Sequence, residues 1–86
     1  MIKVLYRPQR QMILAKFDGN CGLRFVGVYP YNAFRRLLVR FRGEFPLAMF
    51  GEDDNGQGWW LVTSDQLEAI GDFAQRNGLK TVNKTL

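Results

Sequence analysis

Short apolar stretches separated by turn sequences fill the first third of the chain. Residues 2–6 (IKVLY), 11–17 (QMILAKF) and 23–28 (LRFVGV) have the length and the β-branched or aromatic content of strands. The MILA run also fits a helix, but turn sequences on both sides favour a strand. Gly27, inside the third strand, is typical of a bulge or of a close approach by another backbone segment. This part therefore predicts three strands joined by short turns.

The pattern then changes to a helical period. Residues 30–43 (PYNAFRRLLVRFRG) carry apolar side chains at the i, i+3, i+4, i+7 spacing of one helix face: Phe34, Leu37, Leu38 and Phe41. Pro30 suits a helix start, because its missing N–H would have no partner there. Gly43 suits the position just after a helix end. We predict an amphipathic helix over this stretch.

Two further strands follow, joined by a polar loop. Residues 45–50 (FPLAMF) predict a strand, and Pro46 indicates either an edge strand or a strand that begins at this residue. Residues 51–58 (GEDDNGQG) predict the loop, and residues 59–63 (WWLVT) predict the next strand. Alternation in that strand sends Trp59 and Trp60 to opposite faces. One of the two is expected in the core, and the other is buried only if something covers the second face.

The last third of the chain predicts a second helix. Thr63 and Gln66 match a capping box at its start. Its buried stripe is expected to consist of Leu67, Ile70, Gly71 and Ala74. Residues 77–79 (NGL) match a Schellman-type stop. Residues 79–82 suggest a short last strand, and residues 83–86 are expected to fray.

The predicted order is three strands, a helix, two strands, a helix and an optional last strand. Short connections favour antiparallel neighbours. Two helices on one face of such a sheet make a two-layer α+β domain. At 86 residues the chain predicts a single domain with a mainly antiparallel sheet of five to six strands.

Charge is distributed unevenly along the chain. Residues 1–42 contain nine basic side chains and one acidic one, whereas residues 43–79 contain seven acidic side chains and one basic one. The net charge is +4. One interpretation is a basic face for an anionic partner, beside an acidic flank. The other is that the two halves pack together and neutralise each other through surface ion pairs. Both interpretations are compatible with the sequence.

The residue types exclude most catalytic chemistry. The chain has no histidine, which removes the usual general base and the commonest metal ligand. The only cysteine, Cys21, cannot form an internal disulfide or build a zinc site. The acidic loop at residues 52–56 does not have the spacing of a calcium loop. We therefore expect a non-enzymatic protein that uses no cofactor or metal.

The ends and the hydropathy of the chain bear on its location. The stretch MIKVLYRPQRQ lacks the apolar core of a signal peptide, and no apolar run is long enough to span a membrane. The single cysteine suggests a reducing compartment. A cytoplasmic protein without membrane contact is the expectation.

The arginines of the first predicted helix are the leading candidate for a functional surface. Arg36 and Arg40 lie opposite the apolar stripe, and Arg35 and Arg42 lie on one flank. Arginine binds phosphate oxygens through two parallel hydrogen bonds and also stacks on bases. The predicted binding surface, for nucleic acid or another partner, comprises Arg35, Arg36, Arg40, Arg42, Lys16, Arg24, Tyr31 and Trp59, extended by Arg7 and Arg10, with Tyr29 as a further stacking ring. The competing interpretation is a solvated helix face, or salt bridges from Glu68 and Asp72 to Arg36 and Arg40.

A protein-interaction module is the alternative from a different functional class. An exposed tryptophan, an uncovered sheet face and the polarised charge would suit a protein partner or a homodimer. Small regulators or inhibitors encoded by phages and mobile elements are proteins of this sort.

From Phe25 to Gly78 the order of elements resembles the HARP-type modules of annealing helicases. The residues that carry the likeness are Tyr31, Asn32, Leu38, Phe41, Gly43, Trp60, Leu67 and Ile70. The resemblance implies a non-enzymatic module that senses nucleic-acid structure. The hairpin loop of this chain is longer and more acidic than that pattern.

Overall fold

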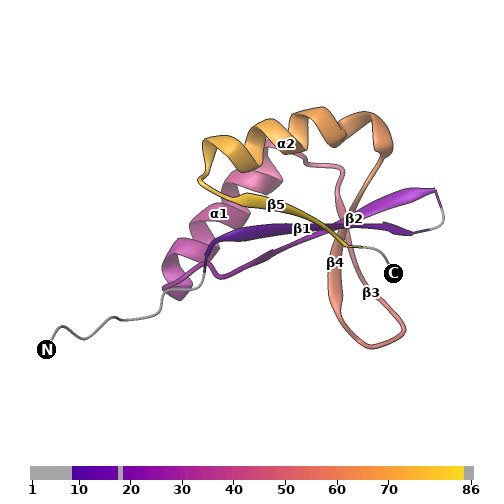
Figure 1. The fold of residues 1–86 in the computed structure, drawn as a ribbon, viewed down its shortest axis with the longest axis horizontal. Helices are drawn as coiled ribbons and strands as arrows, with labels where there is room; N and C mark the ends of the chain where they lie inside the picture. Colours follow the sequence, from indigo (N-terminus) through magenta and orange to yellow (C-terminus); the bar gives the residue numbers. More distant parts are fainter. Residues whose placement is uncertain (1–8, 18, 85–86) are drawn as a thin grey trace, which may run out of the picture.

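The computed structural model describes residues 9–17 and 19–84, which form one five-stranded sheet and two helices (Figure 1). The elements are β1 Gln11–Phe17, β2 Asn20–Val26, α1 Tyr31–Glu44, β3 Met49–Glu52, β4 Gly58–Val62, the 3-10 turn Ser64–Gln66, α2 Leu67–Arg76 and β5 Lys80–Lys84. The strand order is β3-β4-β2-β1-β5, antiparallel except for the parallel pair of β1 and β5. The predicted α+β class is confirmed. The strand predicted at residues 2–6 lies outside the described residues.

The β1–β2 hairpin is longer than the sequence predicts. Its strands pair from Gln11 opposite Val26 to Phe17 opposite Asn20. Cys21 and Gly22 therefore belong to β2, although we predicted them in a turn. The strand also ends before Gly27, which has a positive φ of 73°. The predicted close approach is found there, because a Cβ atom on Gly27 would lie 2.4 Å from a backbone oxygen.

The predicted strand at residues 45–50 is wrong at both ends, since β3 runs from Met49 to Glu52. Phe45 instead ends α1, and its backbone N–H donates to the carbonyl of Phe41 at 2.8 Å. Its ring is buried among the helix residues, with 4% of its surface exposed. Burial of this ring fixes the chain in a turn before β3 can begin.

The hairpin loop between β3 and β4 is organised by one carboxylate. Asp53 accepts hydrogen bonds from the backbone N–H groups of Asn55 and Gln57, each at 2.9 Å. Its second oxygen accepts from the indole N–H of Trp59, also at 2.9 Å. The indole bond, followed by the backbone bond from Gln57, lowers the pKa of Asp53 below its usual value. The acidic loop is thus partly structural.

The two tryptophans of β4 do point to opposite faces, and both contribute to packing. Trp60 faces the helices, and its ring centroid lies 5.4 Å from that of Phe41. Trp59 lies on the other face, yet only 2% of its surface is exposed. Phe17 meets its ring edge-on at a centroid distance of 5.2 Å, and the Arg24 guanidinium lies 5.6 Å from the ring centroid. These neighbours help to bury Trp59 on the face that the helices leave open.

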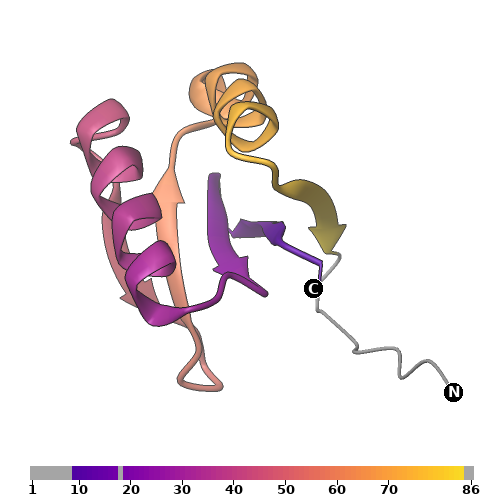
Figure 2. The same cartoon turned by 90° about the vertical axis from the view of Figure 1, so that its left-hand side faces the viewer.

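Both helices pack on one face of the sheet, which makes the predicted two layers (Figure 2). The core between the layers is a cluster of rings centred on Phe41, which is fully buried. Its centroid lies 5.4 Å from Phe25, 5.3 Å from Phe45 and 5.9 Å from Phe73. The apolar stripe of α1 therefore has the structural role that its spacing predicts.

The start and end of α2 confirm the predicted local signals. The capping box of Thr63 and Gln66 is present. Gly78 has a φ of 68°, and the N–H of Leu79 donates to the carbonyl of Ala74 at 2.9 Å, as in a Schellman motif.

The last strand reaches Lys84, so the prediction that residues 83 and 84 fray is wrong. β5 lies beside β1 in register from Gln11 opposite Lys80 to Ala15 opposite Lys84. The pairing is parallel because α2 crosses the sheet and returns the chain to the same end. This pairing supplies backbone partners that hold the strand to its end.

Candidate nucleic-acid interface

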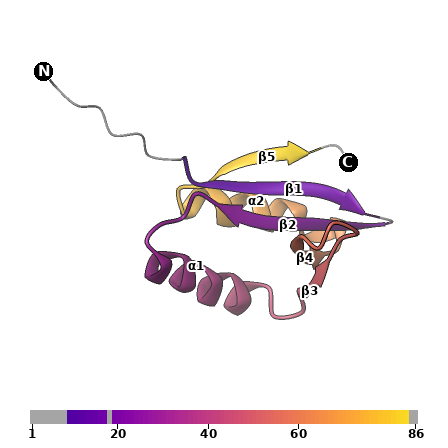
Figure 3. The same ribbon diagram turned by 90° about the horizontal axis from the view of Figure 1, so that it is seen from below.

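The outer side of α1 forms the most basic surface of one element. Arg35, Arg36, Arg40 and Arg42 are all exposed, whereas Leu37 and Phe41 on the opposite side are buried. The helix borders the sheet on one side only, and its other side faces outward (Figure 3). We call the residues Arg35, Arg36 and Arg40 the arginine face.

The arginine face surrounds a shallow hollow of about 430 Å³. Its lining consists of Asn32, Arg35, Arg36, Val39 and Arg40. The lining contains no acidic side chain, and the first turn of α1 has none either. The start of the helix also lacks a capping side chain, so its partial positive charge is not offset by a local anion.

The acidic half of the chain does not neutralise the arginine face. Among residues 9–17 and 19–84, the only ion pair joins Arg76 to Glu44 at 2.8 Å, through two parallel hydrogen bonds. Glu68 and Asp72 pair with neither Arg36 nor Arg40. Arg40 instead donates to the side-chain oxygen of Asn77 at 3.2 Å. That bond leaves its positive charge uncompensated.

The Arg76–Glu44 pair ties the C-terminal end of α1 to that of α2. The two hydrogen bonds that Arg76 donates to Glu44 lower the pKa of Glu44 and raise the pKa of Arg76. The pair therefore stabilises the fold above the ordinary carboxyl pKa near 4.5 and loses that contribution as the pH falls through the lowered pKa. Both side chains are exposed, so the contribution is small.

Three residues of the predicted surface lie elsewhere. Lys16 faces the helix layer, because it lies two residues from Leu14 on the same face of β1 and pairs with Cys21. Arg24 lies on the opposite face, over the ring of Trp59. Trp59 itself is buried and offers a partner almost no surface. Arg7 lies outside the described residues.

Tyr31 does lie beside the arginine face, as the first residue of α1. It is 71% exposed, and Tyr29, just before the helix, is 68% exposed. The structure therefore brings one aromatic and three basic candidates together, with Arg42 at the last turn of the same helix.

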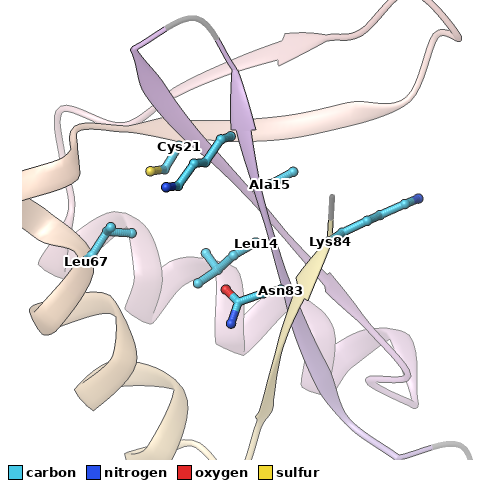
Figure 4. Close-up of a pocket in the computed structure, with 7 residues that line it drawn as sticks. Leu14, Ala15, Cys21, Leu67, Asn83 and Lys84 are labelled. Atoms are coloured by element: carbon cyan, nitrogen blue, oxygen red, sulfur yellow. The ribbon is translucent and has the colours of Figure 1, made fainter. Parts of the chain in front are cut away.

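A second hollow lies between the sheet and α2 and measures about 520 Å³ (Figure 4). The side chains of Leu14, Cys21, Leu67 and Asn83 converge on it. The Cys21 thiol is buried, and no acidic side chain lines the space. Lys16 and Lys84 also line it, and the sequence has no histidine.

Sequence reasoning missed one exposed apolar patch. Leu47, Met49 and Phe50 are 86%, 72% and 60% exposed. Leu47 precedes the edge strand β3, and Met49 and Phe50 lie in it. The available signal was the apolar run around Pro46. Alternation in the strand predicted at residues 45–50 would leave only every second side chain on one face.

The described residues contain no group of three cysteine or acidic side chains able to hold a metal ion. Neither helix in this part of the chain is long and apolar enough to cross a membrane. Comparisons with protein-family models, with curated proteins and with solved structures found no match. The resemblance to HARP-type modules stays a prediction.

Proposed function

We propose that this protein binds nucleic acid in the cytoplasm, without catalysing a reaction, through the arginine face of α1. The observation that carries the proposal is that Arg35, Arg36 and Arg40 are exposed on one helix and form no ion pair within the described residues. A surface held basic in this way attracts a polyanion at long range.

The chemistry of the surface favours phosphate groups. Each guanidinium can donate two parallel hydrogen bonds to the oxygens of one phosphate. Asn32 adds a neutral donor in the same hollow, and the uncapped start of α1 adds a partial positive charge. The predicted likeness to HARP-type modules points to the same class of partner.

Binding should therefore depend steeply on salt. If three arginines each neutralise one phosphate, the logarithm of affinity falls with the logarithm of salt at a slope of about −2 to −3. Raising the salt from about 50 to about 200 mM would weaken binding about 20- to 40-fold. Fluorescence anisotropy of a labelled oligonucleotide measures this slope. The variant Arg36→Ala/Arg40→Ala should flatten the slope by about 2 and bind more weakly at low salt.

A matched control removes the same charge elsewhere. Lys80 and Lys84 are exposed on β5, at the far edge of the sheet from β3. Lys80→Ala/Lys84→Ala should leave the slope near that of the wild type. The proposal would fail if the wild type did not bind at low salt, or if the two double variants lost equal affinity.

A second candidate function, self-association, is favoured by the exposed patch on β3. An edge strand with exposed apolar residues and free backbone groups is a template for another strand. The opposite edge strand, β5, has a lysine at each end. Residues 47–51, which include the two residues before β3 and its first three residues, carry no charge. Antiparallel pairing of β3 with a second copy would set Phe50 opposite Gly51 and Met49 opposite Glu52, with no like charges facing. A second copy of the chain is the partner that fits.

Sedimentation across a range of protein concentrations tests this candidate. The wild type should form a dimer, and Phe50→Lys should sediment as a monomer because it places a charge in the pairing edge. Thr81→Lys adds the same charge to β5 and should leave the dimer intact. A wild type that stays monomeric at the highest concentration would exclude this function.

A further inference from the structure

The two tyrosines at the start of α1 are large rings without a packing role. Tyr29 and Tyr31 are 68% and 71% exposed. Every ring pair found within the described residues involves phenylalanine or tryptophan, and neither tyrosine belongs to one. No core requirement therefore explains aromatic residues at both positions. They flank Pro30, the N-cap residue at which α1 begins, so both lie at the first helical turn or next to it in the sequence.

The geometry of the helix brings the guanidinium groups toward these rings. Side chains of an α-helix lean toward its N-terminus, and residues four apart are neighbours on the surface. Arg35 thus leans toward Tyr31, and Arg36 leans toward Asn32. Arg35 and Arg36 therefore lie about one helical turn from Tyr31, and Arg40 lies about one turn further along α1.

We infer that the ligand of this surface is single-stranded nucleic acid, bound by stacking of unpaired bases on Tyr29 and Tyr31 while the arginine face holds the adjoining phosphates. This inference rests on the proposed function of the same surface. Stacking on an aromatic ring needs a base whose face is free, which an intact duplex does not offer along its length. The arginine face alone would bind single strands and duplexes by charge.

The test compares four proteins on three ligands of equal phosphate number. The ligands are an oligo-dT, an oligo-U and a DNA duplex, each labelled for fluorescence anisotropy. The proteins are the wild type, Tyr29→Leu/Tyr31→Leu, Tyr29→Phe/Tyr31→Phe and Arg36→Ala/Arg40→Ala. Leucine keeps apolar bulk without a ring, and phenylalanine keeps the ring without the hydroxyl. Urea unfolding of each variant checks that the fold is intact.

The wild type should bind the single strands more tightly than the duplex. The leucine variant should lose about tenfold or more of its single-strand affinity, since each stacked base contributes appreciably, while its duplex affinity stays unchanged. The phenylalanine variant should bind like the wild type. Similar affinities for oligo-dT and oligo-U would mean that the bases and phosphates, not the sugar, are recognised, whereas a marked preference would assign the strand to DNA or RNA.

Failure of this inference differs from failure of the proposed function. Equal affinity for all three ligands, sensitive to the arginine variant and insensitive to the leucine variant, would overturn stacking and leave phosphate binding in place. Loss of duplex and single-strand affinity alike in the leucine variant would also overturn stacking. No binding by the wild type to any ligand at low salt would overturn both.

Discussion

Replacing Phe41 with alanine is expected to remove about 3–5 kcal/mol of stability, because it opens a cavity at the centre of the core. Phe41 is fully buried, and its ring neighbours Phe25, Phe45 and Phe73 as well as Trp60. A domain of 86 residues has about 4–13 kcal/mol of total stability. The variant should therefore be largely unfolded or lose much of its unfolding free energy. Urea unfolding followed by circular dichroism measures the difference.

A matched substitution on the same helix separates cavity formation from helix propensity. Val39 is 67% exposed on the outer side of α1. Val39→Ala should change stability by less than about 0.5 kcal/mol, because it opens no cavity. If Phe41→Ala cost no more than Val39→Ala, the ring cluster would not be the centre of the core.

Features encoded by neighbouring residues were predictable from the sequence. The apolar spacing of α1, the capping box at Thr63 and the glycine stop at Gly78 depend on residues within one or two turns. The β1 strand was predicted with its correct bounds because turn sequences delimit it on both sides. These signals were sufficient for the α+β class and for the order of the described elements.

Features that depend on distant residues were not predictable. The local sequence predicts a strand at Phe45, but its ring packs against Phe41 and Phe73 in the core. The local sequence predicts a frayed tail at residues 83 and 84, but both pair with β1. The burial of Trp59 requires Phe17 and Arg24, which come from another hairpin. In each case a tertiary contact decides the outcome.

In the candidate site, too, local features were predictable and features that depend on packing were not. The helical period alone placed Arg36 and Arg40 on the outer side of α1. It could not decide whether Glu68 and Asp72 reach them, since that depends on how α1 and α2 pack. Lys16 and Arg24 were grouped with the arginines by sign of charge, but alternation along their strands sends them to opposite faces of the sheet. Charge content alone therefore did not predict the shape of the surface.

Replacing Gly27 with alanine is expected to destabilise the fold by at least about 2 kcal/mol, through two effects that add. The first is the positive φ of 73°, which an L-residue adopts at a cost of about 1–2 kcal/mol. The second is a collision, because the new Cβ atom would lie 2.4 Å from the carbonyl oxygen of Gln9. That oxygen belongs to the backbone beside the start of β1, so it can move only if the adjoining strand shifts.

A second glycine isolates the collision from the backbone strain. Gly56 has nearly the same φ, 75°, but a Cβ atom there would meet nothing within 4 Å. Gly56→Ala should therefore cost only the strain, about 1–2 kcal/mol, and urea midpoints of the two variants give the comparison. Equal losses would mean that the segment before β1 yields freely to the new atom. A clearly larger loss for Gly27→Ala would show that β2 leaves the sheet tightly against the backbone of Gln9, the contact that sets where the chain turns toward the arginine-bearing helix.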